Sequence, residues 1–346
     1  FYKYIQWLID EQLYDIFKET LSLQMPLGIY HDLAIGSIRG GSDEWMAQDL
    51  FAKQVSIGAP PDDFNLKGQD WGLPPLIPER LRGNGYDFFI QTLRKNMKYF
   101  GALRIDHALG LFRLYWIPKG MTASEGAYVE YPSEDLLRII ALESVRNRTL
   151  IIAEDLGTIG EGVRESLLKF RMLSYRLLYF ERNYPEQSFL LPDKYPETAL
   201  CAVTTHDLPT IYGWWIKRDI EIKKGLGIIT VEDLYKKSIS DREKDKKLLI
   251  AAIRSLGIIT DESITSELSK ELCLAIYEYL AATPCKLLSV SLDDAIGVID
   301  QHNLPGTINE YPNWSQKYPA TIEEIFLNKW FEELSLVFAK YNRSKI

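Results

Sequence analysis

The sequence predicts an α/β fold, a (β/α)8 TIM barrel in which about six of the eight strands are present. The first observation is that six short, apolar, β-rich runs alternate with segments of helical pattern, and such an alternation is typical of a parallel sheet. The second observation is that four of the six runs end on an acid or on a His-Asp pair. A barrel accounts for both, because it carries its active site at the carboxyl ends of its strands.

The predicted elements follow one another along the whole chain. The strand runs are 28–32 (GIYHD), 102–106 (ALRID), 150–154 (LIIAE), 175–180 (YRLLYF), 200–206 (LCAVTTH) and 286–291 (KLLSVS). The predicted helices are 1–23, 86–100, 133–146, 160–170, 244–255, 263–280 and 322–338. A doubly wound sheet is the rival architecture, and it is disfavoured because no GxGxxG motif follows any of the strands.

The start of the chain bears on the two strands that the predicted barrel lacks. Residue 1 is not a methionine, and residues 1–23 have the pattern of an amphipathic helix that is already under way. We therefore expect a longer natural protein in which the missing strands precede residue 1. An open barrel exposes sheet edges and apolar interior, so we expect residues 1–346 alone to fold poorly or to act weakly.

Residues 34–85 stand apart from the strand–helix pattern. They contain 8 of the 22 glycines and 5 of the 16 prolines, clustered in GAPPDDF and GQDWGLPPLIPER. So many turn formers indicate a long excursion over the surface rather than a linker between domains. We expect residues 1–346 to form one catalytic barrel, with residues 34–85 inserted as an active-site loop or subdomain over its mouth.

Composition and charge exclude several classes of protein. The net charge of −8 argues against a nucleic-acid partner, because no basic face is available for phosphates. No run approaches eighteen apolar residues and no secretory signal is visible, so we expect no membrane association and a cytoplasmic location. Three widely spaced cysteines without a CxxC motif agree with a reducing compartment and disfavour disulfides or structural zinc. The oligomeric state stays open.

Six polar residues mark the predicted strand ends: Asp32, Asp106, Glu154 and Asp207, with His107 and His206 beside them. A single carboxylate at the start of a loop is more often a helix cap or a turn former. Four carboxylates at matched strand ends would converge on one pocket if the strands are neighbours in a barrel. Their arrangement therefore favours a functional site over a set of unrelated caps.

Two chemistries use such a cluster of carboxylates. A metal hydrolase is disfavoured, because there is no HxH or HExxH motif and adjacent strand residues point to opposite faces, so each His-Asp pair offers one ligand. We expect no metal and no other cofactor. A retaining glycosidase needs an ionised carboxylate about 5 Å from a protonated carboxylic acid, and such closeness separates their pKa values. Arg104 lies on the strand face of Asp106 and would keep it ionised.

Six motifs surround these residues: GIYHDLAIG (28–36), GAPPDDFNLKGQDWGLPP (58–75), RIDHALGLFRLYWIP (104–118), IIAEDLGTI (151–159), TTHDLPTIYGWW (204–215) and NLPGTINEYPNW (303–314). Together they resemble the 4-alpha-glucanotransferases of glycoside hydrolase family 77, also called amylomaltases or disproportionating enzymes. The RIDH, EDLG and THD pieces are shared in looser form with the wider alpha-amylase clan, whereas the second and sixth motifs are more particular to the amylomaltases. The resemblance implies a cytosolic enzyme that transfers α-1,4-glucan segments between malto-oligosaccharides through a covalent glucosyl-enzyme.

The resemblance also implies roles for individual residues. Asp106 would be the nucleophile, Glu154 the general acid/base, and Asp207 a third carboxylate that holds ring hydroxyls. The implied substrate-binding residues are Asp32, Asp62, Phe64, Gln69, Trp71, Arg104, His107, His206 and Asn303. A loop that covers the glucan would shield the covalent intermediate from water and so favour transfer over hydrolysis. Asp63 departs from the family pattern, because some relatives have an aromatic residue there.

Two alternatives stay open beside this transferase. The first is a hydrolase of the alpha-amylase clan, which the covering-loop motif disfavours. The second is a truncated glucan-binding fragment without catalysis, which the presence of all three carboxylates disfavours. Products formed from maltotriose would distinguish the three.

Overall fold

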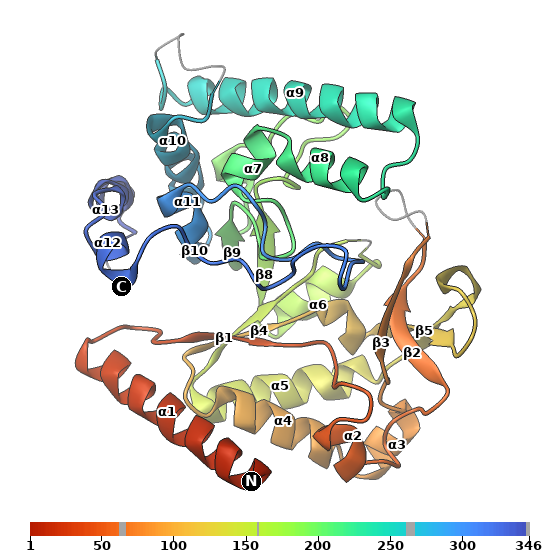
Figure 1. Ribbon diagram of the computed structural model, residues 1–346. Coiled ribbons are helices and arrows are strands. Elements are labelled where there is room, and N and C mark those ends of the chain that lie inside the picture. Colours follow the sequence, from red (N-terminus) through yellow and green to blue (C-terminus); the bar gives the residue numbers. More distant parts are fainter. Residues whose placement is uncertain (62–66, 158, 261–266, 344–346) are drawn as a thin grey trace. The chain divides into compact units, whose positions relative to one another are not determined.

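The computed structural model describes residues 1–61, 67–157, 159–260 and 267–343 (Figure 1). The chain divides into two compact units, Phe1–Tyr175 and Arg176–Ile346. Each unit has its own hydrophobic core, so each is described by itself. No helix among the described residues is long and apolar enough to cross a membrane.

A six-stranded parallel sheet confirms the predicted fold class. Its strands follow one another in chain order: β1 (Tyr30–Leu33), β4 (Ala102–Ile105), β7 (Leu150–Ala153), β8 (Leu173–Leu177), β9 (Ala199–Ala202) and β10 (Leu287–Ser289). The pairs β1–β4, β4–β7, β7–β8 and β9–β10 are all parallel. In the first three strands Leu33 is level with Ile105, and Ile105 is level with Ala153. The residues that follow these three positions therefore leave the sheet at the same edge.

The first unit contains six α-helices among its described residues. They are α1 (Tyr2–Ser22), α2 (Ser42–Met46), α3 (Pro78–Gly83), α4 (Asp87–Met97), α5 (Ser133–Asn147) and α6 (Val163–Lys169). Helices α1, α4, α5 and α6 were predicted from the sequence, whereas α2 and α3 were not. Figure 1 shows α4 and α5 side by side beneath strands β1 and β4. Apolar side chains of both helices, such as Leu93 and Ile140, are fully buried with Leu103 of the sheet. The 3.6-residue spacing of these apolar positions is what makes each helix one-sided.

A four-stranded antiparallel sheet, absent from the sequence-based prediction, lies in the same unit. Its order is β3 (Gln69–Leu73), β2 (Val55–Ala59), β5 (Arg113–Pro118) and β6 (Ala127–Glu130). Residues 34–85 supply β3 and β2, so this segment contains regular structure as well as turns. Strands β2 and β3 pass closely at Gly58, where a Cβ atom would lie 2.0 Å from the carbonyl oxygen of Gln69. Only glycine fits this crossing.

The second unit is mainly helical around β9 and β10. Its helices are α7 (Ile211–Trp215), α8 (Arg218–Gly225), α9 (Glu232–Ser255), α10 (Lys270–Ala281), α11 (Leu292–Ile296), α12 (Ile322–Phe326) and α13 (Trp330–Lys340). Its core contains large aromatic side chains, including Trp215, Tyr277 and Trp330, each at most 2% exposed. The lysine-rich helix α9 buries Leu249 and Ile253 of its apolar face in this core.

Several predicted elements differ from the structure at their ends. The helix predicted at 244–255 begins earlier, at Glu232, because α9 continues through the lysine-rich segment. The strand predicted at 175–180 is wrong in position, because β8 begins at Leu173, where it pairs with β7, and a turn follows it. The helix predicted at 322–338 is two helices, because the side chain of Asn328 accepts the N–H of Trp330 and begins a new one. The helix predicted from residue 263 begins at Lys270, where Ser269 caps it, and residues 261–266 lie outside the described part.

Helix α1 is tied to the rest of the first unit through its middle. The side-chain carboxylate of Asp10 accepts a hydrogen bond from the ammonium group of Lys98 at 2.8 Å. The rings of Tyr14 and Phe17 pack on the ring of Tyr99, with centroid distances of 5.7 and 5.9 Å.

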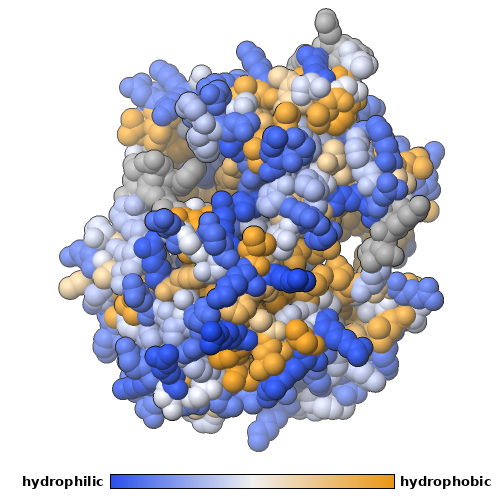
Figure 2. All heavy atoms as spheres, turned by 180° about the vertical axis from the view of Figure 1, so that it is seen from behind, coloured by the Kyte–Doolittle hydropathy of each residue, from blue (hydrophilic) through white to orange (hydrophobic). Residues whose placement is uncertain are grey.

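Figure 2 shows the other face of the molecule, where hydrophobic residues lie among hydrophilic ones. Apolar atoms normally make up more than half of a protein surface, so this distribution by itself indicates no binding site.

Candidate active site

Arg104 organises the strand-end carboxylates of the first unit. Its guanidinium group lies 2.7 Å from Asp32 and 2.9 Å from Asp106. Arg104 lies on β4 and Asp106 directly follows this strand, and the ion pair between them agrees with the predicted common face. Arg104 is only 6% exposed. Burial opposes its positive charge, but the nearby carboxylates outweigh burial and raise the pKa of Arg104, so it stays a cation. This cation stabilises the ionised form of Asp106.

Glu154 lies one strand away from Asp106 in a different environment. It is 8% exposed, and its two carboxyl oxygens accept the backbone N–H groups of His107 at 2.8 Å and Leu156 at 2.9 Å. Burial raises the pKa of Glu154, and the charge of Asp106 raises it further, against the lowering effect of these N–H groups and of Arg104. One carboxylate beside a cation and one buried carboxyl with a raised pKa are the pair that acid/base and nucleophilic chemistry needs.

His107 connects Asp106 to Glu154 through the backbone. Its φ angle of 44° lies in the left-handed region, which non-glycine residues seldom adopt, and this conformation directs its N–H toward Glu154. Burial lowers the pKa of its imidazole to about 4, so His107 is neutral at pH 7. The ring of Trp71 packs edge-on against it at 5.4 Å. A neutral imidazole in this place can donate or accept one hydrogen bond without adding charge.

The second unit presents its own polar cluster after β9. The side-chain amide of Asn303 donates to Asp207 at 2.6 Å, and His206 lies 3.3 Å from the other carboxylate oxygen of Asp207. The backbone N–H of Asn303 donates to the carbonyl of His206. Trp314 packs against the His206 ring at 5.3 Å. Asp207 and Asn303, 96 residues apart in the sequence, are thus direct partners.

Comparison with known proteins assigns the family. A family model described as 4-alpha-glucanotransferase, that of glycoside hydrolase family 77, matches residues 1–322. This chain belongs to that family. A 4-alpha-glucanotransferase of Haemophilus influenzae is 41% identical over 349 residues, covering 100% of this chain and 49% of the relative. One of Mycobacterium tuberculosis is 38% identical, covering 95% of this chain and 46% of the relative. The chain therefore spans about half the length of the curated relatives that it matches.

Solved structures show the same fold. An amylomaltase from Corynebacterium glutamicum superimposes with a TM-score of 0.90 and 30% identity, covering 97% of this chain and 49% of that protein. An amylomaltase from Streptococcus agalactiae, solved in complex with acarbose, superimposes with a TM-score of 0.75 over 98% of this chain and 62% of that protein. Its identity is 21%, so this second match supports the fold alone.

Four residues are predicted to belong to a loop that covers the substrate, and the structure describes two of them. Gln69 and Trp71 lie on β3, where the indole N–H donates to the Gln69 side chain at 3.0 Å. Asp62 and Phe64 fall outside the described residues. The contact between Trp71 and His107 places one predicted loop residue against the residue that directly follows Asp106.

Two residues near the site were missed by the sequence-based reasoning. Asp155 is fully buried and accepts the N–H of Tyr175 at 2.9 Å, the hydroxyl of Ser174 and the guanidinium of Arg164. It fixes the loop that follows Glu154, and its place directly after Glu154, facing the other way, is the signal that could have identified it. The other missed residue is Trp314, whose φ of 57° is also left-handed.

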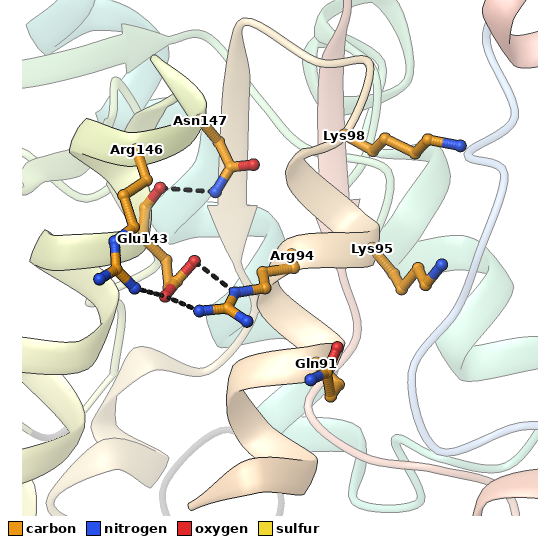
Figure 3. A pocket seen from close by; sticks show the side chains of 7 residues that line it. All are labelled: Gln91, Arg94, Lys95, Lys98, Glu143, Arg146 and Asn147. Atoms are coloured by element: carbon orange, nitrogen blue, oxygen red, sulfur yellow. Dashed lines mark hydrogen bonds and ion pairs between the residues drawn. The ribbon is translucent and has the colours of Figure 1, made fainter.

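A surface pocket of about 590 Å³ lies elsewhere in the first unit, between the ends of α4 and α5 (Figure 3). Arg94 and Arg146 both bind the buried Glu143 at 2.9 Å, while Lys95 and Lys98 point away from it. The pocket is thus lined by a structural network of ion pairs and contains none of the strand-end residues.

Among the described residues no group of three His, Cys, Asp or Glu side chains could hold a metal ion.

Proposed function

We propose that this protein is a 4-alpha-glucanotransferase that transfers α-1,4-glucan segments between malto-oligosaccharides with retention of configuration. The carrying observation is the pair formed by Asp106, bound to Arg104, and Glu154, buried with a raised pKa on the neighbouring strand. Family membership supports the same assignment. The substrate is an α-glucan, and no metal or nucleotide takes part in the proposal.

In the first half-reaction, a carboxylate oxygen of Asp106 attacks the anomeric carbon of the donor sugar. The glycosidic C–O bond breaks, and Glu154 gives its proton to the leaving oxygen, which departs as a shortened glucan or glucose. Asp106 then holds the donor segment as a β-linked ester. A carboxyl with a raised pKa suits the acid role, since it keeps its proton nearer to neutral pH than an ordinary glutamic acid does.

In the second half-reaction, the Glu154 carboxylate takes the proton of an acceptor-sugar hydroxyl. That oxygen attacks the anomeric carbon and releases Asp106, so two inversions give net retention. We propose that Asp207 holds ring hydroxyls of the same sugar. The proposed binding residues beside it are Asp32, Asp62, Phe64, Gln69, Trp71, Arg104, His107, His206 and Asn303. The segment around Trp71 would cover the intermediate and exclude water.

We also propose a cytoplasmic location. All three cysteines, Cys201, Cys273 and Cys285, are buried free thiols among the described residues. Free thiols suit a reducing compartment, whereas an oxidising one favours disulfides.

The product pattern from maltotriose tests the function. The protein should be purified from the organism that produces it. It should convert maltotriose into glucose and a series of longer maltodextrins, which chromatography separates. The Asp106→Asn variant should form neither. Maltose and glucose without longer products would identify a hydrolase instead. Glucan binding without any turnover would identify a binding protein and contradict the transferase.

A further inference from the structure

The short segment that carries Asn303 is fixed by side chains buried within its own loop. Gln301 is 4% exposed, and its amide group donates to the carbonyl oxygen of Asn303 at 2.6 Å. The carbonyl of Gln301 in turn accepts the hydroxyl of Tyr311 at 2.6 Å and the side-chain amide of Gln316 at 3.0 Å. Residues 311–316 therefore return to the segment just before Asn303 and bind it through two side-chain hydrogen bonds.

Asn303 passes this constraint to Asp207. Its backbone N–H donates to the carbonyl of His206, and its side chain donates to Asp207 at 2.6 Å. The Asp207 side chain is 39% exposed, so packing alone does not select one orientation of its carboxylate. Two contacts orient it: the amide of Asn303 donates to one oxygen at 2.6 Å, and His206 lies 3.3 Å from the other oxygen. The position of Asn303 is thus one determinant of the orientation of the Asp207 carboxylate.

We propose that Gln301 and Tyr311 are positioning residues for Asp207 and act through Asn303. This proposal rests on the proposed function, in which Asp207 holds hydroxyls of the reacting sugar. Tyr311 is 6% exposed and its hydroxyl is committed to Gln301, so it influences the sugar through the loop. Such a network keeps a half-exposed carboxylate in one geometry while leaving its outer face available to substrate, and misplacement of a catalytic group by about 1 Å can lower the rate about a hundredfold.

The Tyr311→Phe variant removes one hydroxyl and leaves the ring in place, so it tests this chain of contacts with little disturbance. Tyr279→Phe is the matched control, because Tyr279 is also buried in the same unit and its hydroxyl donates to the carbonyl of Leu190 at 2.7 Å. Each variant loses one tyrosine-to-carbonyl hydrogen bond. Only Tyr311 belongs to the network that reaches Asp207.

The measured quantity is the ratio of initial rates for α-glucosyl fluoride and its 2-deoxy analogue, each with maltotriose as acceptor. This ratio is independent of the fraction of correctly folded enzyme, so a merely structural role does not change it. A hydrogen bond to the 2-hydroxyl that strengthens in the transition state favours the ordinary donor. The Asp207→Asn variant gives the ratio that remains when this carboxylate is lost.

We expect Tyr311→Phe to lower the ratio toward the Asp207→Asn value by about threefold, within the range for one lost neutral hydrogen bond. Tyr279→Phe should keep the wild-type ratio. A second variant, Gln316→Ala, removes the other donor to the Gln301 carbonyl and should lower the ratio in the same direction. A wild-type ratio in Tyr311→Phe, or an equal change in Tyr279→Phe, overturns the positioning role. Absence of transfer by the wild-type protein would overturn the proposed function itself, which is a separate outcome.

Discussion

Asp106 and Glu154 are both acids at strand ends, yet their surroundings prepare them for different tasks. The Asp106 side chain is 32% exposed and touches a guanidinium group, whereas Glu154 is nearly covered and is bound by two backbone N–H groups. Burial is the main cause of the raised pKa of Glu154, and the charge of Asp106 adds to it. The proposed division into nucleophile and acid therefore rests on position and contact, not on residue type.

Replacing Asp106 with asparagine should lower the pKa of Glu154. The variant removes a negative charge that disfavours ionisation of Glu154, while Arg104 keeps its positive charge and still favours it. The carboxyl resonances of the two proteins, followed by carbon NMR across pH 3 to 8, report this pKa directly. An unchanged or higher pKa in the variant would show that the two carboxyl groups do not interact.

Replacing Glu154 with glutamine should lower transfer from maltotriose by about 10²- to 10⁴-fold, the usual contribution of a general acid or base. Formation of the glucosyl-enzyme from α-glucosyl fluoride should be affected much less, because fluoride leaves without a proton. Stopped-flow measurement of fluoride release gives the rate for α-glucosyl fluoride, and the initial rate of glucose release gives the rate for maltotriose. Equal losses on both donors would contradict the acid role of Glu154.

At the scale of single elements, one buried carboxylate joins helices α4 and α5. Glu143 is 2% exposed and accepts two hydrogen bonds from Arg94 and one from Arg146 (Figure 3). Each of these bonds is 2.9 Å long. Contacts with Arg94 and Arg146 lower the pKa of Glu143, so it stays ionised despite burial. Because both partners reach solvent, the ion pairs stabilise the fold less than fully buried ones would.

The Glu143→Gln variant should therefore lower the free energy of unfolding by about 1–3 kcal/mol. Glu134→Gln on the same helix is the control, since Glu134 is half exposed and pairs with Arg138 four residues later. That change should be worth at most about 0.5 kcal/mol. Urea unfolding of the three proteins measures both effects, and similar losses in the two variants would count against a special role for Glu143.

Helix α11 contains an acid that should make stability depend on pH. Asp294 is 1% exposed, and burial raises its pKa to about 7, while Tyr277 and the N–H of Ile211 donate to it. The unfolded carboxyl ionises near pH 4, so its contribution to stability is complete below pH 4 and is lost as pH rises to about 7.

Asp294→Asn cannot ionise, so it should gain about 2–4 kcal/mol relative to wild type between pH 4 and pH 7. Urea unfolding at pH 4.5, 5.5 and 7 measures the difference at each pH. A constant difference across this range would mean that Asp294 ionises in the folded protein as it does in the unfolded chain.

Local pattern predicted the central elements well and the ends of others less well. Strands β1, β4 and β7 and helices α4 and α5 were predicted because short apolar runs and 3.6-residue spacing are read within one element. The break at Asn328 depends on a side-chain contact with the N–H of Trp330, and the antiparallel sheet depends on pairing between segments about 60 residues apart. Neither depends on local periodicity.

At the scale of the whole molecule, the parallel order of the six strands was predictable, because strand–helix–strand units place consecutive strands side by side. That order also placed Asp106 and Glu154 at one sheet edge. The specific hydrogen-bond partners were not predictable from sequence, because they are distant in the chain. Arg104 donates to Asp32, the N–H of His107 donates to Glu154, and the side-chain amide of Asn303 donates to Asp207.

The central claim is that Asp106 becomes covalently bound to the sugar that is transferred. The most direct measurement is mass spectrometry of peptides after incubation with 5-fluoro-α-glucosyl fluoride, a donor whose glucosyl-enzyme is hydrolysed slowly. We predict one fluoroglucosyl adduct on the peptide that contains Asp106, and no adduct in Asp106→Asn. An adduct on a different residue, or transfer from maltotriose by the Asp106→Asn variant at the wild-type rate, would contradict the account.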